Sequence, residues 1–254
     1  MINRLSFQDG LTAFLDVLLP RKCIVCGEVL SLHEKHVCLK CLGDLPRTFY
    51  SFMPRNRMSE RFNDLVQRDL DSSNNRTDVP VPYSLATALF YYRASTGYRN
   101  ITKSLKYHGN IAAGRYFAGM LADEMIASGF YSDIDAVVPV PLHWTRRWSR
   151  GYNQAEVIGK VIASALGVPL RADILKRLRR TRTQTKLSIE GKTANVRGAF
   201  GVRKGSDING LSHILLVDDV FTTGATLHSC LLALREEKSF PIKISVATLA
   251  CVGD

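Results

Sequence analysis

The sequence lacks any apolar run that approaches the roughly 18 residues of a membrane-spanning helix. The apolar stretch LTAFLDVLLP, residues 11–20, is shorter, carries Asp16 and lacks a small-residue cleavage site. It therefore predicts an amphipathic helix rather than a signal peptide. We expect a protein with no membrane span and, because no export signal is visible, a cytoplasmic one.

Internal repeats and low-complexity tracts are also absent. Hydrophobic residues make up 46% of the chain and charged residues 22%, which is typical of a globular protein and not of a disordered one. A length of 254 residues allows one sizeable domain with a small appendage, or two domains.

Acidic residues are few, with 23 Asp and Glu against 34 Lys and Arg, so the formal net charge is +11. The excess is concentrated between Arg171 and Lys204, where eleven basic residues stand against two acids, Asp173 and Glu190. Such a stretch indicates either an anionic partner, which is a nucleic acid or a phosphorylated small molecule, or simply a solvated face.

Cysteine is scarce but clustered. Four of the six cysteines form the pattern C-x2-C-x11-C-x2-C, at Cys23, Cys26, Cys38 and Cys41. The two pairs supply four thiolates, the tetrahedral ligand set that structural zinc prefers. A four-cysteine site has no open position for a substrate. We therefore expect a structural zinc that contributes most of this small unit's folding free energy, on the order of 10 kcal/mol.

Two other interpretations of the four cysteines are weaker. Disulfides are disfavoured in a reducing cytoplasm, and a redox dithiol would need only one of the two pairs. The remaining Cys230 and Cys251 lie in apolar surroundings and are expected to be inert core residues.

From residue 83 onward, segments of strand and helix character alternate. The run HILLVDDV at 213–220 is apolar without a break until its two acids, as in a parallel sheet covered on both faces. The alternation predicts an α/β domain with a mostly parallel sheet flanked by helices. The expected strands are 84–92, 135–141, 174–179, 213–220 and 243–251, and the expected helices are 101–109, 116–129, 153–167 and 225–237.

The chain is expected to divide into three parts. Residues 1–50 hold the N-terminal helix and the four-cysteine zinc unit, and residues 83–254 form the α/β domain. Between them, 51–82 has mixed charges and the run SSNN, which is typical of a linker. Helical spacing of its apolar residues allows a short helix near 59–70.

Two adjacent carboxylates, Asp218 and Asp219, end an apolar strand, and the loop TTGAT follows at 222–226. Ligands gather at the carboxyl ends of parallel strands. The loop's backbone N–H groups, its hydroxyls and the start of the next helix are suited to hold a phosphate, and Gly224 permits the turn. Two carboxylates would repel that phosphate but accept hydrogen bonds from a sugar diol. The segment therefore predicts a site for a ribose 5-phosphate group.

Two other interpretations of this segment are weaker. A P-loop nucleotidase needs G-x4-G-K-[ST], and the GKT at 191–193 has Lys186 where the first glycine should be. A buried strand end with no ligand would leave two adjacent acids without partners, which is costly.

The apolar run, the two acids and the following T-G-x-T resemble the phosphoribosyl pyrophosphate (PRPP) signature of type I phosphoribosyltransferases. With the cysteine pairs, three further stretches make nearly the whole chain resemble the ComF family of competence-associated proteins, which is related to the GntX group. They are LKYHG (105–109), VPVPLHWTRRWSRGYNQAEVIG (138–159) and the set Arg177, Thr181, Gln184, Leu187 and Arg197. Lys192 departs from the arginine expected in many relatives.

The resemblance implies a type I phosphoribosyltransferase-like fold that binds PRPP with Mg²⁺, beside a small zinc-finger domain. It also implies a link to DNA uptake in natural competence, or to nucleoside metabolism. Asp218 and Asp219 would hold the ribose hydroxyls as the catalytic pair, and the loop after them the 5-phosphate. The diphosphate would lie at the turn near Leu142 and His143. The implied PRPP-binding residues are Asp218, Asp219, Thr222, Thr223, Gly224, Ala225, Thr226, Arg146, Arg147 and Lys106, with Arg150 as a further anion contact.

The acceptor of the ribosyl group cannot be read from the sequence, because neither 83–110 nor 174–203 shows a base-reading motif. Two hypotheses stay open. One is a phosphoribosyltransferase acting on a base or a nucleic-acid component. The other is a non-catalytic module, regulated by PRPP, that meets single-stranded DNA or helicase-type DNA-uptake proteins. Trp144 and Trp148 are candidates for stacking on bases, although core packing or a protein contact is the simpler interpretation.

Overall fold

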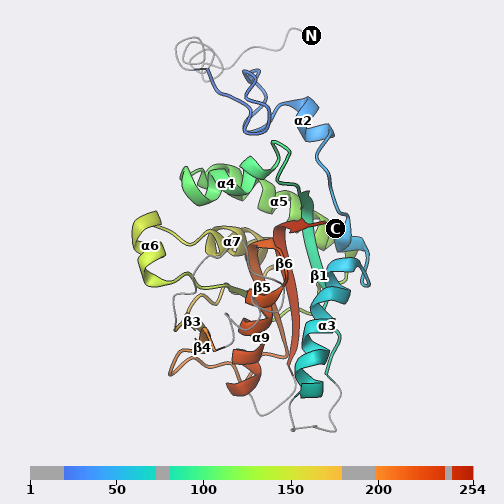
Figure 1. Cartoon of the computed structure of the whole chain (residues 1–254), viewed down its shortest axis with the longest axis vertical. Helices are drawn as coiled ribbons and strands as arrows, with labels where there is room; N and C mark the ends of the chain where they lie inside the picture. Colours follow the sequence, from blue (N-terminus) through green and yellow to red (C-terminus); the bar gives the residue numbers. More distant parts are fainter. Residues whose placement is uncertain (1–19, 73–80, 179–197, 238–241, 254) are drawn as a thin grey trace.

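The computed structural model describes residues 20–72, 81–178, 198–237 and 242–253 (Figure 1). Almost all of the predicted helix at 11–20 and most of the basic stretch 171–204 lie outside these residues. None of the helices in the described ranges combines the length and the apolar character that crossing a membrane requires.

A four-stranded parallel sheet forms the centre of the molecule, with strand order β1-β6-β5-β2 (Figure 1). Four of the predicted strand segments form it, as β1 (Ala86–Tyr92), β2 (Ala136–Pro139), β5 (His213–Phe221) and β6 (Lys243–Val252). Because β5 pairs on both sides, with β6 and β2, its apolar residues are buried on both faces. The predicted mostly parallel α/β fold is confirmed.

Helices cover both faces of the sheet. One face packs against α3 (Arg57–Ser72) and α9 (Ala225–Glu237), and the other against α5 (Ile111–Ser128) and α7 (Gln154–Leu166). Successive strand residues point to opposite faces, so Leu216 joins the first cluster while its neighbours Leu215 and Val217 join the second. Next to α5, α4 (Arg99–Tyr107) lies near the carboxyl ends of the strands (Figure 1).

Side-chain caps help to place the helix starts. The amide oxygen of Asn110 accepts a hydrogen bond from the backbone N–H of Ala113 at 3.0 Å, before α5. Asn153 does the same for Ala155 at 3.1 Å, before α7. Each cap satisfies one of the N–H groups that the first turn of a helix leaves without a partner.

Several short elements complete the fold. They are α2 (Leu39–Gly43), the 3₁₀ helix η1 (Tyr50–Phe52), α6 (Trp144–Arg150) and an antiparallel hairpin of β3 (Leu175–Arg177) and β4 (Phe200–Val202). The strand expected at 174–179 therefore exists, but it lies outside the parallel sheet. The sequence reasoning predicted neither β4 nor α6, because both are too short to show periodicity.

The segment 51–82 differs from the expected linker. Residues 57–72 form α3, and Met58, Phe62 and Val66 of this helix are buried in the same cluster as the sheet. The i, i+4 spacing of these side chains gives the helix one apolar face, which packs against the sheet and α9. The described part of the segment is thus packed in the α/β core, and the division into three domains stays a prediction.

Candidate functional site

A cleft of about 900 Å³ opens at the carboxyl ends of β2 and β5. Most of the charge along its walls is positive. Among the described residues it is lined by the cationic side chains of Lys103, Lys106, Arg146, Arg150 and Arg177 and by the two carboxylates of Asp218 and Asp219. A cleft with this charge is suited to an anionic ligand that also carries hydroxyl groups.

The two carboxylates lie within the last residues of β5, and both line the cleft. Asp219 is 3% exposed, and its Oδ2 lies 2.6 Å from the Nζ of Lys106 on α4. Asp218 is half-buried, and its Oδ1 accepts a hydrogen bond from the backbone N–H of Asp219 at 2.8 Å. The two acids therefore have different surroundings, because among the described residues Asp219 is ion-paired with Lys106 and Asp218 has no cation within pairing distance.

Burial and neighbouring charges shift the pKa values of Asp218 and Lys106. Burial, followed by the negative charge of Asp219, raises the pKa of Asp218 to about 7. Burial lowers the pKa of Lys106, but the attraction of Asp219 outweighs it and leaves that pKa raised. The cleft thus holds a lysine that stays charged and a carboxyl group that titrates near neutral pH.

The TTGAT loop leads directly into α9, which begins at Ala225. Thr222 and Thr226 line the cleft, whereas Thr223 and Ala225 are buried. The hydroxyl oxygen of Thr223 accepts a hydrogen bond from the N–H of Ala225 at 3.4 Å. The loop therefore presents alternate threonines and the first turn of α9 to the cleft, the arrangement that anion sites at helix starts use.

Close packing against other side chains, which the sequence did not reveal, also requires a glycine at position 224. Its φ is +80°, in the left-handed region, and a Cβ there would lie 2.8 Å from the ring of Phe221 and 3.1 Å from Leu65 of α3. Glycine is thus required both for the turn and for close packing against the α3 side of the molecule.

Of the three arginines that follow β2, two line the cleft and one points away from it. Arg146 and Arg150 of α6 line the cleft, and Arg150 lies over the ring of Tyr107 at 5.7 Å. Arg147, which was expected to bind PRPP, does not line the cleft and pairs instead with Glu156 of α7 at 2.5 Å. At about 100° per residue, Arg146 and Arg150 lie about 40° apart around the helix axis and Arg147 about 100° from Arg146, which agrees with this division.

The sequence reasoning missed Lys103 as a site residue. It lies three residues before Lys106 on α4, and this spacing places both lysines on the same side of the helix. That i, i+3 spacing could have identified Lys103 as a site residue from the sequence. The sequence analysis named Arg177 only as one of the residues that carry the family resemblance, without a role in the site. It reaches the cleft from β3 and lies over the ring of Phe200 at 5.1 Å.

The two tryptophans of α6 are not core residues. Trp144 is 72% exposed and Trp148 is 87% exposed. Of the simpler interpretation, core packing or a protein contact, the core-packing part is therefore wrong, and the protein contact stays a prediction. Both tryptophans lie on the same short helix as Arg146 and Arg150, and none of the residues of α6 is buried.

The four cysteines of the N-terminal unit meet at one point. Their sulfur atoms all lie within 4.8 Å of one another, and the sulfurs of Cys26 and Cys38 are 3.8 Å apart. Four thiolates about 2.3 Å from a zinc ion form a tetrahedron with edges of about 3.8 Å. Backbone N–H groups also point at the sulfurs, as from Cys38 to Cys23 and from Cys41 to Cys38. The cluster can therefore hold a metal ion.

This cysteine unit packs against the start of α4. Tyr98 donates a hydrogen bond to the carbonyl of Cys41 at 3.1 Å, and Asn100 donates one to the carbonyl of Ile24 at 3.3 Å. A Cβ on Gly97 would lie 2.2 Å from the carbonyl oxygen of Val25, so only glycine fits at this contact. The helix that carries Lys103 and Lys106 is thus held at its other end by the cysteine unit.

Comparison with known proteins gives curated relatives for part of the chain. No family model matches the chain. It is 37% identical over 102 residues to competence protein F of Haemophilus influenzae, a match that covers 40% of this chain and 44% of that protein. It is 32% identical over 102 residues to competence protein ComFC of Bacillus subtilis, covering 40% of this chain and 38% of that one.

A third curated relative is the DNA utilization protein YhgH of Escherichia coli K12. It is 36% identical over 93 residues, covering 37% of this chain and 40% of YhgH. The chain thus spans less than half the length of the curated relatives it matches.

Solved structures resemble the chain only loosely. A glutamine PRPP amidotransferase from B. subtilis has a TM-score of 0.35 at 22% identity, covering 54% of this chain and 26% of that one. An adenine phosphoribosyltransferase has a TM-score of 0.34 at 13% identity, covering 64% and 83%. The fold assignment is therefore based on the sheet topology. Over about 40% of its length the chain is similar to the competence proteins F and ComFC, which agrees with the ComF-like resemblance that the motifs predict.

Proposed function

We propose that the cleft binds PRPP with Mg²⁺ and that the chain is a ComF-like, PRPP-dependent phosphoribosyltransferase. One observation supports this most directly. Two carboxylates, Asp218 and Asp219, share a cleft with five cationic side chains and with Thr222 and Thr226 of the loop before α9. PRPP combines a ribose diol, a 5-phosphate and a diphosphate, and each of these groups has a chemically matched partner there.

The positions of the side chains around the cleft suggest which part of PRPP each would bind. Asp218 and Asp219 would accept hydrogen bonds from the ribose hydroxyls. The N–H groups and hydroxyls of 222–226 would hold the 5-phosphate. Arg146, Arg150 and Lys103 would lie along the diphosphate. Mg²⁺, when bound with PRPP, would supply positive charge that offsets the charge of the leaving diphosphate.

Ribosyl transfer builds positive charge on the sugar as diphosphate departs. The carboxylates of Asp218 and Asp219, held beneath the ring, would stabilise that charge, and the surrounding cations would stabilise the leaving group. In the free protein Lys106 neutralises Asp219, so the substrate's hydroxyls would compete with Lys106 for this carboxylate. The acceptor of the ribosyl group is outside this proposal.

Isothermal titration calorimetry with PRPP and Mg²⁺ tests the assignment. The double variant Asp218→Asn with Asp219→Asn should bind more weakly by at least tenfold, because each lost charged hydrogen bond costs about 1.5–3 kcal/mol. Asp123→Asn, an exposed aspartate on α5, is the matched control and should bind like the wild type. Equal affinity of the double variant and the control would refute the ribose site.

A second candidate function is favoured by the exposed tryptophans. We propose that α6 binds single-stranded nucleic acid, with Trp144 and Trp148 stacking on bases and the neighbouring arginines holding phosphates. Base stacking on an aromatic ring is worth about 1–3 kcal/mol per base. The names of the relatives, competence protein F and DNA utilization protein YhgH, are consistent with work on DNA.

Fluorescence anisotropy with labelled single-stranded DNA tests this second function. Trp144→Ala and Trp148→Ala should each weaken binding by about fivefold or more, with an unchanged salt slope, because they remove stacking and not charge. Phe130→Ala, an exposed aromatic outside the cleft lining, is the control. If all three variants bind like the wild type, α6 is not the interface.

We further propose that the four cysteines bind zinc and that residues 1–50 form the zinc-finger unit, with 83–254 as the phosphoribosyltransferase-like domain. The 3.8 Å sulfur spacing supports a tetrahedral ion. A cytoplasmic location and a helicase-type or other DNA-uptake partner belong to the same proposal. Metal analysis of protein purified without chelator should give one zinc per chain, and its absence would contradict the assignment.

A further inference from the structure

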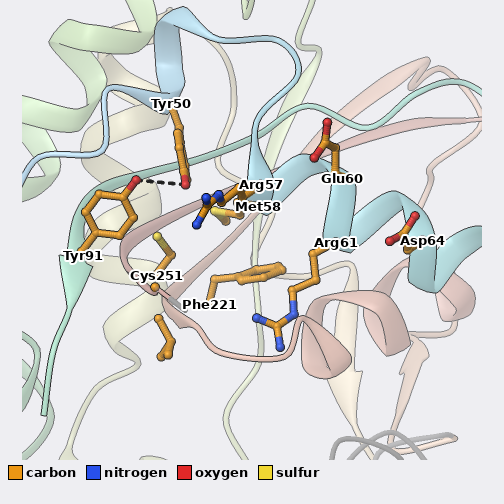
Figure 2. Close-up of a pocket in the computed structure, with 11 residues that line it drawn as sticks. Tyr50, Arg57, Met58, Glu60, Arg61, Asp64, Tyr91, Phe221 and Cys251 are labelled. Carbon is orange, nitrogen blue, oxygen red and sulfur yellow. Dashed lines mark hydrogen bonds between the residues drawn. The ribbon is translucent and has the colours of Figure 1, made fainter.

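A second cavity lies at the carboxyl ends of β1, β5 and β6, next to the first turns of α3 (Figure 2). We call it the tyrosine pocket, after Tyr50 and Tyr91 in its lining. Its volume is about 320 Å³, within the range of about 300–1,000 Å³ that small-molecule sites occupy. Buried side chains, among them Phe221 and Cys251, form its inner surface, and charged side chains of α3 form its mouth.

The tyrosine pocket is separate from the cleft, because none of the described residues lines both. On β1, Tyr91 lines the pocket and Tyr92 lines the cleft. On β5, Phe221 lines the pocket while Val220 lines the cleft. Successive strand residues point to opposite faces, so the two cavities lie back to back across the strand ends. A ligand of the pocket would therefore leave the cleft open.

The inner surface of the pocket is aromatic. The rings of Tyr50 and Tyr91 meet edge to face with centroids 5.9 Å apart, and the Tyr91 hydroxyl donates a hydrogen bond to that of Tyr50 at 3.1 Å. Burial raises the pKa of Tyr50, so its hydroxyl stays neutral at physiological pH. With Phe221 these rings offer an apolar wall for a planar group and hydroxyls for its polar edge.

The mouth of the pocket carries two arginines and two acidic residues, all from α3. Arg57 and Arg61 lie four residues apart on α3 and therefore on the same side of the helix. Figure 2 shows the guanidinium of Arg57 near Tyr50 and that of Arg61 near Phe221. Two guanidinium groups one turn apart suit a phosphate, which each can bind through two N–H groups. Glu60 and Asp64, also at the mouth, can accept hydrogen bonds from amino groups.

We propose that the tyrosine pocket binds a nucleoside monophosphate. The base would lie against the aromatic wall, the phosphate between Arg57 and Arg61, and an amino group of the base would donate to Glu60 or Asp64. The lining thus offers an aromatic wall for the ring, two guanidinium groups for the dianion and two carboxylates for exocyclic donors, and these carboxylates restrict the phosphate to the side of the arginines. The proposal does not depend on PRPP binding, since none of the pocket residues lies in the cleft.

Calorimetry with AMP as the probe, in the absence of Mg²⁺, tests the proposal. Wild-type protein should bind one AMP, and Arg57→Ala with Arg61→Ala should weaken binding at least tenfold. Arg68→Ala, an exposed arginine later on the same helix, should leave the affinity unchanged. Adenosine, which lacks the anion, and ribose 5-phosphate, which lacks the ring, should each bind at least tenfold more weakly than AMP.

The cleft is the competing location for a nucleotide. Lys106→Ala should leave AMP binding intact, and AMP should still bind when the cleft is saturated with PRPP. Loss of AMP binding in Lys106→Ala, retention in the double arginine variant, or no binding at millimolar AMP would each overturn the proposal. Circular dichroism checks that the double variant and Lys106→Ala are folded. Arg61→Gln, which keeps the length and polarity of the side chain, should still show several-fold weakening.

Discussion

The charge of the buried Asp219 carboxylate is compensated by Lys106. Asp219 is 3% exposed, and Lys106 lies 2.6 Å from it across the cleft. Removing one member of a buried ion pair leaves the other charge without compensation, which costs more than the pair itself contributes. The lysine therefore has a structural task in the free protein besides any contact with a ligand.

Lys106→Met should lower the free energy of unfolding by about 1–3 kcal/mol, because the Asp219 carboxylate loses its charged partner. Urea denaturation followed by circular dichroism measures this loss. Lys103→Met, one turn earlier on α4, is the matched control and should cost less than about 0.5 kcal/mol, as surface substitutions usually do. An equal loss in the two variants would show that the ion pair does not stabilise the fold.

Asp218 gives the cleft a dependence on pH. Its pKa is raised to about 7, first by burial and then by the charge of Asp219. An unfolded aspartate ionises near pH 4, so the folded state holds an extra proton between about pH 4 and 7. The contribution of Asp218 to stability is therefore present at low pH and is lost as the pH rises through this window.

Ligand binding should show the opposite trend. If ionised Asp218 accepts hydrogen bonds from ribose, PRPP affinity should rise between pH 6 and 8 with a midpoint near 7. Calorimetry at several pH values measures this. In Asp218→Asn the rise should disappear, apart from any titration of PRPP itself. A wild-type profile that matches that of the variant would remove Asp218 from the ligand site.

At the scale of elements, the loop between β5 and α9 connects the two sides of the molecule. Gly224 contacts Phe221 and Leu65, which belong to the α3 side, while Thr222 and Thr226 face the cleft. The position of the loop is therefore set by packing on α3 as well as by the turn itself. This is why α3, expected as part of a linker, is an element of the candidate site's support.

Gly224→Ala should lower stability by about 1–3 kcal/mol, because it adds left-handed strain and a contact of 2.8 Å with the Phe221 ring. Thermal unfolding measures the change. Gly119→Ala, in the middle of α5 with nothing within 4 Å of the added Cβ, should instead be neutral or slightly stabilising. A Gly224→Ala protein as stable as the wild type would show that the loop relaxes freely.

At the scale of the whole molecule, the cysteine unit and the sheet share one core. Cys23, Leu30, Val37 and Cys41 belong to the same buried cluster as Leu105 and the residues of α5. Unfolding of the unit would expose the start of α4, including the contact of Gly97 with Val25. Metal binding by the four cysteines would therefore affect the shape of the cleft through α4.

Removing the metal should lower the melting temperature of the entire protein, and not only of the small unit. Because shared burial couples the unit to α4, Cys26→Ser or treatment with a strong chelator should shift a single thermal transition downward and weaken PRPP binding. Added zinc should restore the chelated protein but not the variant. Two separate transitions, with an unchanged transition for the sheet, would contradict this coupling.

The sequence determined the elements of the central sheet, because long apolar runs and helical periods report burial directly. It also located the cysteine cluster and the Asp218–Thr226 segment, where spacing along the chain is itself the chemical signal. Tertiary structure decided which side chains share a cavity. Arg147 turns to Glu156, Lys103 joins the cleft, and the tryptophans of α6 stand in solvent. It also created the tyrosine pocket from η1, α3 and three strand ends, since such neighbours are set by packing between segments far apart in the chain.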